Sequence, residues 1–499
     1  MAIAAAAAPH VKVLGVEAFE QPFRLRLPFR FGVITVTHGL QAFVRVRVRL
    51  ADGLEGFGYA AETLAAKWFD KNLALSDEQN QHQLRRSIEL AADGYQAAPA
   101  STAFALFAEN HASQIELGRE LELPPLVSSF GPALLDRAVM DGLCRLLGVS
   151  FWVAMRANLA GMRPHPLIAD LGDFDFDTLL AGLEPASSIE ARHTVGLLDP
   201  IVAADQAQGT RVDDGLPETL EEVVQTYGHR CFKLKVGGDP RADIDRLLRI
   251  AGVLDRIAGP LHVTLDGNEQ FEDVDSVVAL WRAMEDEPAL QRLCASTLFI
   301  EQPIKRQVAL SRSVAPLAHF RPVIIDESDG ELDAFVRARA LGYGGVSSKN
   351  CKGFYRSLIN LARCRVWNTG GEGGHFLSGE DLTTQAGLSV QQDLALVSLL
   401  GLSDVERNGH HFIDGFAGRP QGEARAFLDA HPDLYHDAGG RVRLRIRDGR
   451  LAIGSLGDPG FGSSVVPDLA DTPRAPAADW PTGRVALRND PPAAGAPLA

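Results

Sequence analysis

The chain has 499 residues and a mass of 53.7 kDa, and its 49 lysines and arginines against 64 aspartates and glutamates give a formal charge of −15. A chain this acidic is repelled by nucleic-acid phosphates and by anionic lipid surfaces, so we expect no nucleic acid and no membrane among its partners. Its 46% hydrophobic and 23% charged residues are typical of a globular protein, and no apolar run reaches the roughly 18–20 residues of a membrane helix.

The cysteines and the N-terminus both bear on where the protein works. The five cysteines form no Cys-X-X-Cys pair and lie mostly in apolar stretches, which favours reduced core residues. Residues 1–9 are mostly small and apolar but lack a basic segment and a long apolar core, so we interpret them as a disordered tail rather than a signal peptide. Together these features predict a cytoplasmic protein.

The N-terminal part has first the pattern of strands and then that of helices. Residues 43–50 alternate apolar and basic side chains, as a half-buried antiparallel strand does, and Asp52-Gly53 follows as a turn. Between residues 76 and 159 the apolar side chains recur at helical spacing. Strands followed by helices predict an α+β domain.

Short apolar runs alternate with amphipathic segments of helical length from about residue 193 to residue 400. Such alternation predicts a parallel sheet with helical crossovers. About seven such units, without a glycine-rich dinucleotide fingerprint after the first strands, favour a closed (β/α) barrel over an open doubly wound sheet. The expected strands are residues 193–197, 231–236, 262–265, 297–300, 322–325, 345–348 and, with a weaker pattern, 376–377.

Three consecutive strands of this expected barrel end in a carboxylate. Asp266, Glu301 and Asp326 each follow an apolar run, and one strand–helix unit separates each from the next. The carboxyl ends of barrel strands converge on one mouth, so these side chains would repel one another unless a cation lay between them. A hard divalent cation fits such oxygen ligands, Mg²⁺ first and Mn²⁺ as a substitute. Helix capping is the alternative for any one of these residues, and three strands in a row disfavour it.

Lysines end the strands on both sides of these carboxylates. Lys233 and Lys235 lie two residues apart, so they face the same side of the strand that precedes Asp266. Two neighbouring ammonium groups depress each other's pKa, and a lysine tuned toward neutrality is a usable general base. Lys349 ends the run after Asp326, across the barrel from the first pair. A Lys-X-Lys pair alone is more often part of an exposed strand, so its position carries the argument.

Other motifs are less informative. His410-His411 looks like a metal-binding pair, but adjacent residues of a strand face opposite ways, so we interpret both as surface or core histidines. The glycine-rich run at residues 370–374 lacks the Lys-Ser/Thr of a phosphate loop. No His-Glu-X-X-His, Gly-X-Ser-X-Gly or His-X-His motif occurs.

The order of the strand-end motifs resembles that of the enolase superfamily. Lys-X-Lys, Asp-Gly-Asn, Glu-Gln-Pro, Asp-Glu-Ser and then lysine follow one another as in its mandelate racemase/muconate lactonizing enzyme group, closest to the muconate-lactonizing and dipeptide-epimerase branch. Residues 22–58 also resemble the family's N-terminal capping domain, and residues 451–462 its returning C-terminal segment. The resemblance implies an α/β fold with a modified TIM (β/α)7β barrel, an N-terminal α+β capping domain completed by a C-terminal segment, and a homo-oligomer.

Pattern and resemblance together divide the chain. The final stretch is rich in Pro, Ala and Asp without a period, as disordered tails are. In the family, specificity comes from capping-domain loops, which correspond to residues 24–38 and 59–71 here. We expect a disordered tail in residues 1–9, the capping domain in 10–165, the barrel in 185–410, the returning segment in 411–467, and a second disordered tail in 468–499.

Carried over to this sequence, the resemblance implies a metal centre. Asp266, Glu301 and Asp326 become the Mg²⁺ ligands. Glu327 is the alternative third ligand, because the mandelate-racemase branch uses a glutamate in that neighbourhood.

The resemblance also implies roles for the lysines. Lys235 and Lys349 become the acid/base pair. Lys233 becomes the cation that lowers the pKa of Lys235 and contacts the substrate carboxylate, and Asn268 becomes a further substrate contact.

Three functions remain open at this point. The first is a Mg²⁺-dependent racemase/epimerase, dehydratase (lyase) or cycloisomerase that removes the α-proton of a small-molecule carboxylate to form a metal-stabilised enediolate. A metal-dependent barrel hydrolase is the second, which the missing His-X-His and the Lys-X-Lys pair disfavour. A non-catalytic barrel acting as a binding protein is the third, which the intact lysines disfavour. The substrate stays open, since Gly353-Phe354 and Glu380-Asp381 match the family pattern only loosely.

Overall fold

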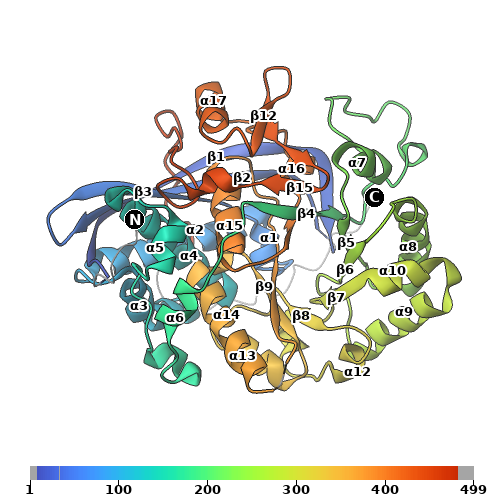
Figure 1. The fold of residues 1–499 in the computed structure, drawn as a ribbon, viewed down its shortest axis with the longest axis horizontal. Helices are drawn as coiled ribbons and strands as arrows, with labels where there is room; N and C mark the ends of the chain where they lie inside the picture. Colours follow the sequence, from blue (N-terminus) through green and yellow to red (C-terminus); the bar gives the residue numbers. More distant parts are fainter. Residues whose placement is uncertain (1–7, 33, 372, 482–499) are drawn as a thin grey trace, which may run out of the picture.

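The computed structural model describes residues 8–32, 34–371 and 373–481. A strand-and-helix layer from the N-terminal part lies beside a barrel of parallel strands, and a C-terminal segment contacts both (Figure 1). None of the helices in this part of the chain combines the length and the apolar character needed to cross a lipid bilayer.

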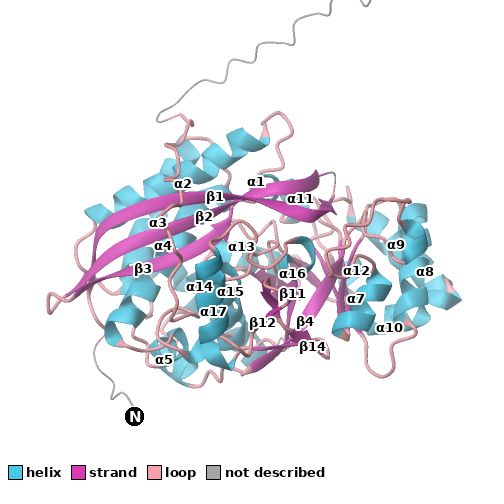
Figure 2. Ribbon diagram, turned by 90° about the horizontal axis from the view of Figure 1, so that it is seen from above, coloured by secondary structure: helices cyan, strands magenta, loops and turns pink. Residues whose placement is uncertain are grey.

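The N-terminal layer is built on an antiparallel sheet in the order β1-β2-β3. The predicted alternation is confirmed in β2, where Val44, Val46 and Val48 are buried while Arg47 and Arg49 are exposed. Figure 2 shows the helices behind this sheet, and shows β1 and β2 reaching beyond them toward the barrel. The elements are β1 (Val11–Phe31), β2 (Ile34–Leu50), β3 (Glu55–Thr63), α1 (Ala66–Phe69), α2 (Asp77–Ala97), α3 (Ala103–Glu120), α4 (Pro125–Leu147), α5 (Phe151–Arg156) and α6 (Phe176–Ala181).

Helix α4 packs directly against β2 and β3. Gly58 on β3 permits this approach, because a Cβ atom there would lie 1.9 Å from the carbonyl oxygen of Ala138. Proline in the first turn of α4 and left-handed Gly148 after its last turn fit the usual ends of a helix. The core of this layer is therefore a sheet covered on one face by helices.

The barrel has eight parallel strands and closes by pairing β11 with β4, which confirms the predicted fold. Each strand but the last leads into a helical crossover, and β11 is followed only by the short α16. The strands are β4 (Ser188–Val195), β5 (Cys231–Lys235), β6 (His262–Asp266), β7 (Thr297–Glu301), β8 (Val323–Ile325), β9 (Gly345–Ser348), β10 (Phe376–Gly379) and β11 (Asp404–Arg407).

The outer layer of the barrel consists of helices of very different lengths. They are α7 (Leu220–Tyr227), α8 (Pro240–Leu254), α9 (Val274–Asp286), α10 (Gln291–Ser296), α11 (Arg306–Ala309), α12 (Ala315–Ala318), α13 (Ala334–Ala340), α14 (Phe354–Thr369), α15 (Leu388–Leu399) and α16 (Gly409–Phe412). Short 3₁₀ helices are η1 (Pro166–Leu171), η2 (Ala203–Asp205), η3 (Pro288–Leu290), η4 (Asn350–Lys352) and η5 (Gly454–Gly457).

The C-terminal segment contacts both the barrel and the N-terminal layer. Strand β15 pairs antiparallel with β4 of the barrel. Further on, the Phe461 ring stacks on Phe151 of α5 with the ring centroids 3.6 Å apart, and the Phe461 amide donates to Asp141 on α4. The elements are α17 (Gln421–Ala430), β12 (Tyr435–Asp437), β13 (Val442–Leu444), β14 (Ile446–Arg447) and β15 (Arg450–Ala452).

The start predicted for the second disordered tail, residue 468, is too early. The Ala475 amide donates to the carbonyl of Ala18 on β1, and the Trp480 indole N–H donates to the carbonyl of Leu121. These partners are far away in the sequence, so composition alone does not reveal them. Residues 1–7 and 482–499 of the two expected tails lie outside the described residues.

Candidate active site

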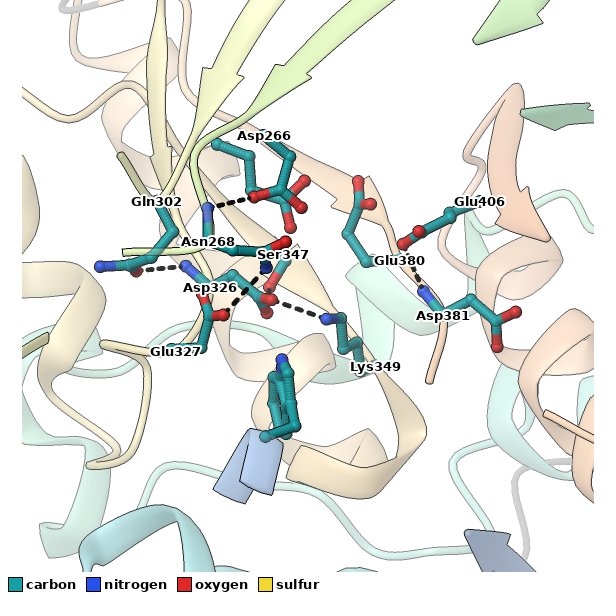
Figure 3. Close-up of polar contacts among 12 residues, drawn as sticks. Asp266, Asn268, Gln302, Asp326, Glu327, Ser347, Lys349, Glu380, Asp381 and Glu406 are labelled. Atoms are coloured by element: carbon teal, nitrogen blue, oxygen red, sulfur yellow. Dashed lines mark hydrogen bonds and ion pairs between the residues drawn. The ribbon is translucent and has the colours of Figure 1, made fainter. Parts of the chain in front are cut away.

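Charged side chains gather at the carboxyl-terminal mouth of the barrel. The strand register places Lys235, Asp266 and Glu301 side by side on β5, β6 and β7. Asp326 and Lys349 directly follow β8 and β9, and Figure 3 shows both side chains pointing toward each other. The structure thus brings to one place all seven residues that the sequence singles out, namely Lys233, Lys235, Asp266, Asn268, Glu301, Asp326 and Lys349.

Lys233 lies at the centre of the cluster and is only 1% exposed. Its ammonium nitrogen is 2.9 Å from Asp266 Oδ2, 2.7 Å from Glu301 Oε2, 2.8 Å from Glu380 Oε2 and 3.0 Å from Glu406 Oε2. Burial opposes its charge, but the surrounding carboxylates raise the pKa of Lys233 well above its ordinary value. The expectation of a depressed lysine pKa is therefore wrong for Lys233, because four carboxylates outweigh one neighbouring ammonium group.

The two candidate acid/base lysines stand on opposite sides of the barrel. Their strands β5 and β9 have three strands between them in either direction around the closed sheet. Lys235 Nζ is 2.5 Å from Asp266 Oδ2, and Lys349 Nζ is 2.6 Å from Asp326 Oδ2 and 4.4 Å from the centre of the Trp68 ring. Each lysine is thus paired with one of the predicted metal ligands.

Asp326 is held from several directions. It accepts from the hydroxyl of Ser347, and its backbone amide donates to Gln302 Oε1 at 2.8 Å. Burial opposes its charge, but the ammonium groups of Lys349 and Lys352 hold the pKa of Asp326 well below its ordinary value. Asp326 is therefore ionised, as a metal ligand must be.

Glu301 has the opposite electrostatic environment. Burial and the neighbouring carboxylates of Asp266 and Glu380 raise the pKa of Glu301 well above its ordinary value, despite the nearby Lys233. Within the described residues its Oε1 has no donor, and its Oε2 has only the Lys233 ammonium group at 2.7 Å, outside hydrogen-bonding geometry. Such a buried, unsatisfied group is costly unless a cation or a proton compensates it.

Other oxygens beside Glu301 also lack donors, and they provide the test of whether a metal ion fits. The side-chain oxygen of Asn268 and Oε2 of Glu327 are buried and have no hydrogen-bond partner among the described residues. Together with the carboxylates of Asp266, Glu301 and Asp326 they would offer only oxygen donors, the type that Mg²⁺ prefers. The residues present therefore fit a hard divalent cation.

The loops after β6 and β7 adopt backbone conformations that are uncommon for non-glycine residues. The φ angles of Asn268, Glu269 and Gln302 are +40°, +67° and +32°. This turn lets the Asn268 amide donate to Asp266 Oδ1 at 2.8 Å while its side chain donates to Glu327 Oε1 at 3.1 Å. Strained backbone is typical of functional sites, where surrounding contacts enforce it.

Glu327, the alternative third ligand, directly follows Asp326 in the sequence. Its Oε1 accepts from Asn268 and is 3.4 Å from Lys71 Nζ, and burial raises its pKa. Lys71 comes from the N-terminal layer and also lies 2.6 Å from Glu269 Oε2. The capping layer thus contacts the rim of the barrel through charges of which Glu269 and Glu327 are buried and Lys71 is partly exposed.

Sequence reasoning missed two residues of the mouth, Arg192 and Glu406. Arg192 on β4 lies 2.5 Å from Glu380 Oε1, and Glu406 on β11 accepts from the Thr194 hydroxyl at 2.5 Å as well as pairing with Lys233. Arg192 directly precedes the expected strand 193–197, whose counterpart β4 begins earlier, at Ser188. Glu406 belongs to a strand with one apolar residue, so no strand-end pattern marked either residue. Asp381, the neighbour of Glu380, instead pairs with Arg407 at 3.1 Å.

A cavity of about 110 Å³ opens onto these side chains. Lys233, Lys235, Asn268 and Lys349 line its barrel side, so it reaches both candidate acid/base groups. The capping layer supplies a mostly apolar wall, largely from the segments 24–38 and 59–71 that were expected to set specificity. Its residues are Phe23, Leu25, Phe29, Phe31, Ile34, Val36, His38, Gly39, Thr63, Leu64, Ala65, Ala66, Lys67, Trp68, Asp77 and Gln81.

Comparison with known proteins identifies similar chains. Residues 215–469 match the family described as enolase C-terminal domain-like. Among curated proteins, none matches the chain.

Similar solved structures include an enolase from Bradyrhizobium complexed with magnesium and mandelic acid, with 16% identity, a TM-score of 0.57 and coverage of 94% of this chain and 99% of that one. A muconate lactonizing enzyme from Pseudomonas fluorescens complexed with muconolactone has 18% identity, a TM-score of 0.54 and coverage of 91% and 97%. A dipeptide epimerase from Methylococcus capsulatus complexed with Mg and a dipeptide has 20% identity, a TM-score of 0.50 and coverage of 88% and 99%. At these identities the likeness shows a shared fold.

Proposed function

Since the chain belongs to the enolase C-terminal domain-like family, within the mandelate racemase/muconate lactonizing enzyme group of the enolase superfamily, we propose that it removes the α-proton of a small carboxylate in a Mg²⁺-dependent reaction. One observation carries the proposal: Lys235 and Lys349 face one cavity from opposite strands, and each pairs with a carboxylate of one acidic cluster. A carboxylate substrate in this cavity would have a nitrogen base or acid on either side of its α-carbon.

The ligands we propose are Asp266, Glu301 and Asp326, with Asn268 and Glu327 close by. Mg²⁺ bound there would supply the positive charge that stabilises an enediolate, and would compete with the lysines for two of these carboxylates. In the ion-paired state burial lowers the pKa of Lys349, but the charge of Asp326 outweighs burial, so this pKa is raised above its ordinary value. Lys349 in this state is an acid, and it becomes a base once Asp326 is engaged elsewhere.

The other charged groups of the mouth would position the reacting ones. Lys233 is held by four carboxylates, so we assign it first to stabilising the acidic cluster and only secondarily to contact with the substrate. Trp68 lies over Lys349 Nζ, which limits the directions open to that ammonium group. The apolar capping segments that line the cavity would displace water around a bound substrate, which would strengthen the electrostatic interactions there.

The lining also supports a substrate class. Phe29, Phe31, Ile34 and Val36 of the capping sheet provide few hydrogen-bond partners for a polyhydroxylated chain. We therefore propose a carboxylate whose α-substituent is largely apolar, such as an N-acyl amino acid or a hydrophobic dipeptide, rather than an acid sugar. Racemisation or epimerisation, β-elimination of water and cycloisomerisation share one step, the transfer of a proton between an enediolate and its α-carbon.

The test is exchange of the α-proton for deuterium in D₂O with Mg²⁺, followed by NMR. N-acyl amino acids, dipeptides and acid sugars are compared, and the fate of each exchanged carbon distinguishes the three reactions. We expect exchange with apolar carboxylates and its loss in Lys235→Ala and Lys349→Ala. A protein that binds Mg²⁺ but exchanges no carboxylate of any class would contradict the proposal.

A further inference from the structure

Four histidines lie close together outside the barrel mouth. His193 is on β4, His229 lies between α7 and β5, and His410 and His411 are on α16. Arg192 and Thr194, on either side of His193 in β4, contact the carboxylates inside the barrel. Since neighbouring residues of a strand face opposite sides, His193 faces outward. The cluster therefore lies between the barrel wall and its outer layer.

Three of these histidines are arranged as metal ligands would be. One ring nitrogen each of His193, His229 and His410 lies within 4.8 Å of the other two. The three residues are 2%, 1% and 7% exposed. Tetrahedral ligands about 2.0–2.1 Å from a Zn²⁺ ion stand about 3.4 Å apart, so small side-chain rotations would close the set.

Four of the six ring nitrogens of these three residues lack partners within the described structure. Nδ1 of His193, Nε2 of His229 and both ring nitrogens of His410 are buried without a hydrogen bond. His229 Nδ1 lies 2.9 Å from the carbonyl oxygen of Ala191, which can only accept, so Nδ1 carries the proton and Nε2 the lone pair. A hydrogen bond of this kind is the usual support of a metal-bound imidazole.

The charge state of the cluster suits a cation. Burial lowers the pKa of His229 to about 4 and the pKa values of His193 and His410 well below the ordinary value, so all three are neutral at pH 7. The neighbouring cations Arg26 and Arg407 also lower the pKa of His410. Arg26 is neutralised by Asp214 at 2.5 Å and Arg407 by Asp381 at 3.1 Å, while Glu406 faces His193 from inside the barrel.

A path to the cluster exists on the side of His410. This residue lines a cavity of about 150 Å³, together with Tyr227, Ile413, His436 and Arg443. A metal ion held by three histidines keeps its fourth position for water or another small ligand, and such a cavity leaves room for it. Imidazole nitrogens without carboxylates favour Zn²⁺ and similar transition metals and disfavour Mg²⁺.

We propose that His193, His229 and His410 form a second metal site, selective for a divalent transition-metal ion such as Zn²⁺ and separate from the carboxylates of the barrel mouth. A bound ion joins β4, the loop before β5 and α16. Because α16 directly follows the strand that carries Glu406, the ion stabilises one side of the active-site wall.

The test uses the full chain with Mg²⁺ at saturation, so that the carboxylates of the mouth are occupied. Zn²⁺ is titrated against a chromophoric chelator, and Co²⁺ is added separately as a spectroscopic probe. We expect one Zn²⁺ per chain, a visible Co²⁺ spectrum of the intense tetrahedral type, and a rise in melting temperature with Zn²⁺. His229→Asn and His410→Asn should each weaken Zn²⁺ binding by more than about 100-fold, since loss of a direct ligand exceeds the loss of a supporting contact.

Two control variants assign the site. His436→Asn changes a histidine of the same cavity outside the cluster and should leave Zn²⁺ binding unchanged. Cys231→Ser removes the thiol of another potential metal group, formed with Glu190 and His262, and should also leave it unchanged.

Four results overturn the proposal. They are no Zn²⁺ binding in saturating Mg²⁺, Zn²⁺ binding retained in both cluster variants, Zn²⁺ binding lost in Cys231→Ser, and an octahedral Co²⁺ spectrum. Should the cluster variants fail to fold, as judged by circular dichroism, the wild-type stoichiometry and Co²⁺ spectrum decide.

Discussion

The acidic cluster of the barrel mouth and the histidine cluster outside the barrel wall are separated by a single strand. They differ in whether their buried ionisable groups are paired with opposite charges or are neutral. On β4, Arg192 faces the mouth and pairs with Glu380, while the next residue, His193, faces outward and has an unpartnered Nδ1. In the mouth, opposite charges compensate one another. In the histidine cluster, burial removes the charge instead, because no carboxylate is paired with any of the rings within the described residues.

The difference teaches which sites can hold which ions. A buried ionisable group either finds an opposite charge or becomes neutral. The mouth follows the first route at Asp266 and Asp326, whose lysine partners keep them ionised although burial opposes the charge, while burial raises the pKa of Glu301. Ionised oxygens suit a hard cation. The histidine cluster follows the second and retains neutral nitrogens, which suit a softer one.

The largest expected effect is on catalysis at the mouth. Removing the lysine that acts as the general base, in Lys235→Ala or in Lys349→Ala, should lower the rate of α-proton exchange by about 10²–10⁴-fold, the usual contribution of such a base. In a racemase or epimerase each variant should lose one substrate stereoisomer; in a dehydratase or cycloisomerase only one variant should stop proton abstraction. Lys→Arg should fail almost as badly, since guanidinium keeps its proton near neutral pH.

The control for both lysine variants is Lys305→Ala, which removes only an exposed ion pair with Glu272. It should retain wild-type turnover. Full turnover in both active-site variants would mean that neither lysine touches the reacting carbon.

The histidine cluster should make the protein sensitive to acid. With a folded-state pKa of about 4 against about 6.5 unfolded, His229 contributes stability that is present above pH 6.5 and is lost as the pH falls toward 4. The loss is about 3 kcal/mol for this residue. Urea unfolding between pH 8 and pH 4.5 in EDTA should show a steeper decline in the wild type than in His229→Gln. Equal slopes would mean that His229 is not held neutral.

Substitution of the proposed metal ligand Glu301 at the mouth should raise the thermal stability in EDTA and remove the stabilisation by Mg²⁺. Glu301→Gln removes a buried carboxyl group whose pKa is raised, so it should increase thermal stability in EDTA. The same variant should lose the stabilisation by Mg²⁺, which is about 2.7 kcal/mol at a concentration 100 times the Kd.

Asp266→Asn is the matched comparison for Glu301→Gln. The lysines hold the pKa of Asp266 below its ordinary value, so this change should remove stability in EDTA as well as Mg²⁺ binding. Melting curves of the two variants with and without Mg²⁺ check both signs. A stabilising Asp266→Asn would show that repulsion among carboxylates outweighs the lysines at that position.

The smallest effect should come from the contact between the capping layer and the rim. Lys71→Met breaks the ion pairs with Glu269 and Glu327, but Lys71 is partly exposed and Glu269 keeps Arg306 at 2.8 Å. We expect a loss of about 1 kcal/mol or less in the free energy of unfolding. Urea unfolding at low and high salt checks it, and a loss that grows with salt would argue against an electrostatic origin.

The architecture could be predicted wherever one strand carried its own apolar pattern. Residues 262–265 and 297–300 appeared as runs because apolar side chains such as Val263, Leu265 and Ile300 alternate along them and are buried. Strand β11, Asp-Val-Glu-Arg, escaped the prediction because only Val405 among its residues is apolar. Its polar side chains are stable only opposite Lys233, Thr194 and Asp381, which come from other parts of the chain.

The candidate site divides in the same way. Strand-end carboxylates and lysines can be read from position, because a parallel barrel brings the ends of its strands together. Their charge states cannot, since the raised pKa of Lys233 depends on four carboxylates from four different strands. The proposed nitrogen site was likewise hidden, because His193, His229 and His410 are far apart in the sequence and the pair His410-His411 turned out to lie on a helix.

The sequence by itself determined the class of fold, the order of the strand-end motifs and the position of seven residues at one mouth. These depend on periodicity and spacing, which are local properties of the chain. The tertiary structure alone decided which buried groups stay charged and which become neutral, which residues of the capping layer line the cavity, and where residues 468–481 dock. The physical reason is that burial and pairing are set by neighbours distant in sequence, and both change the free energy of a charged group by more than its own local sequence can.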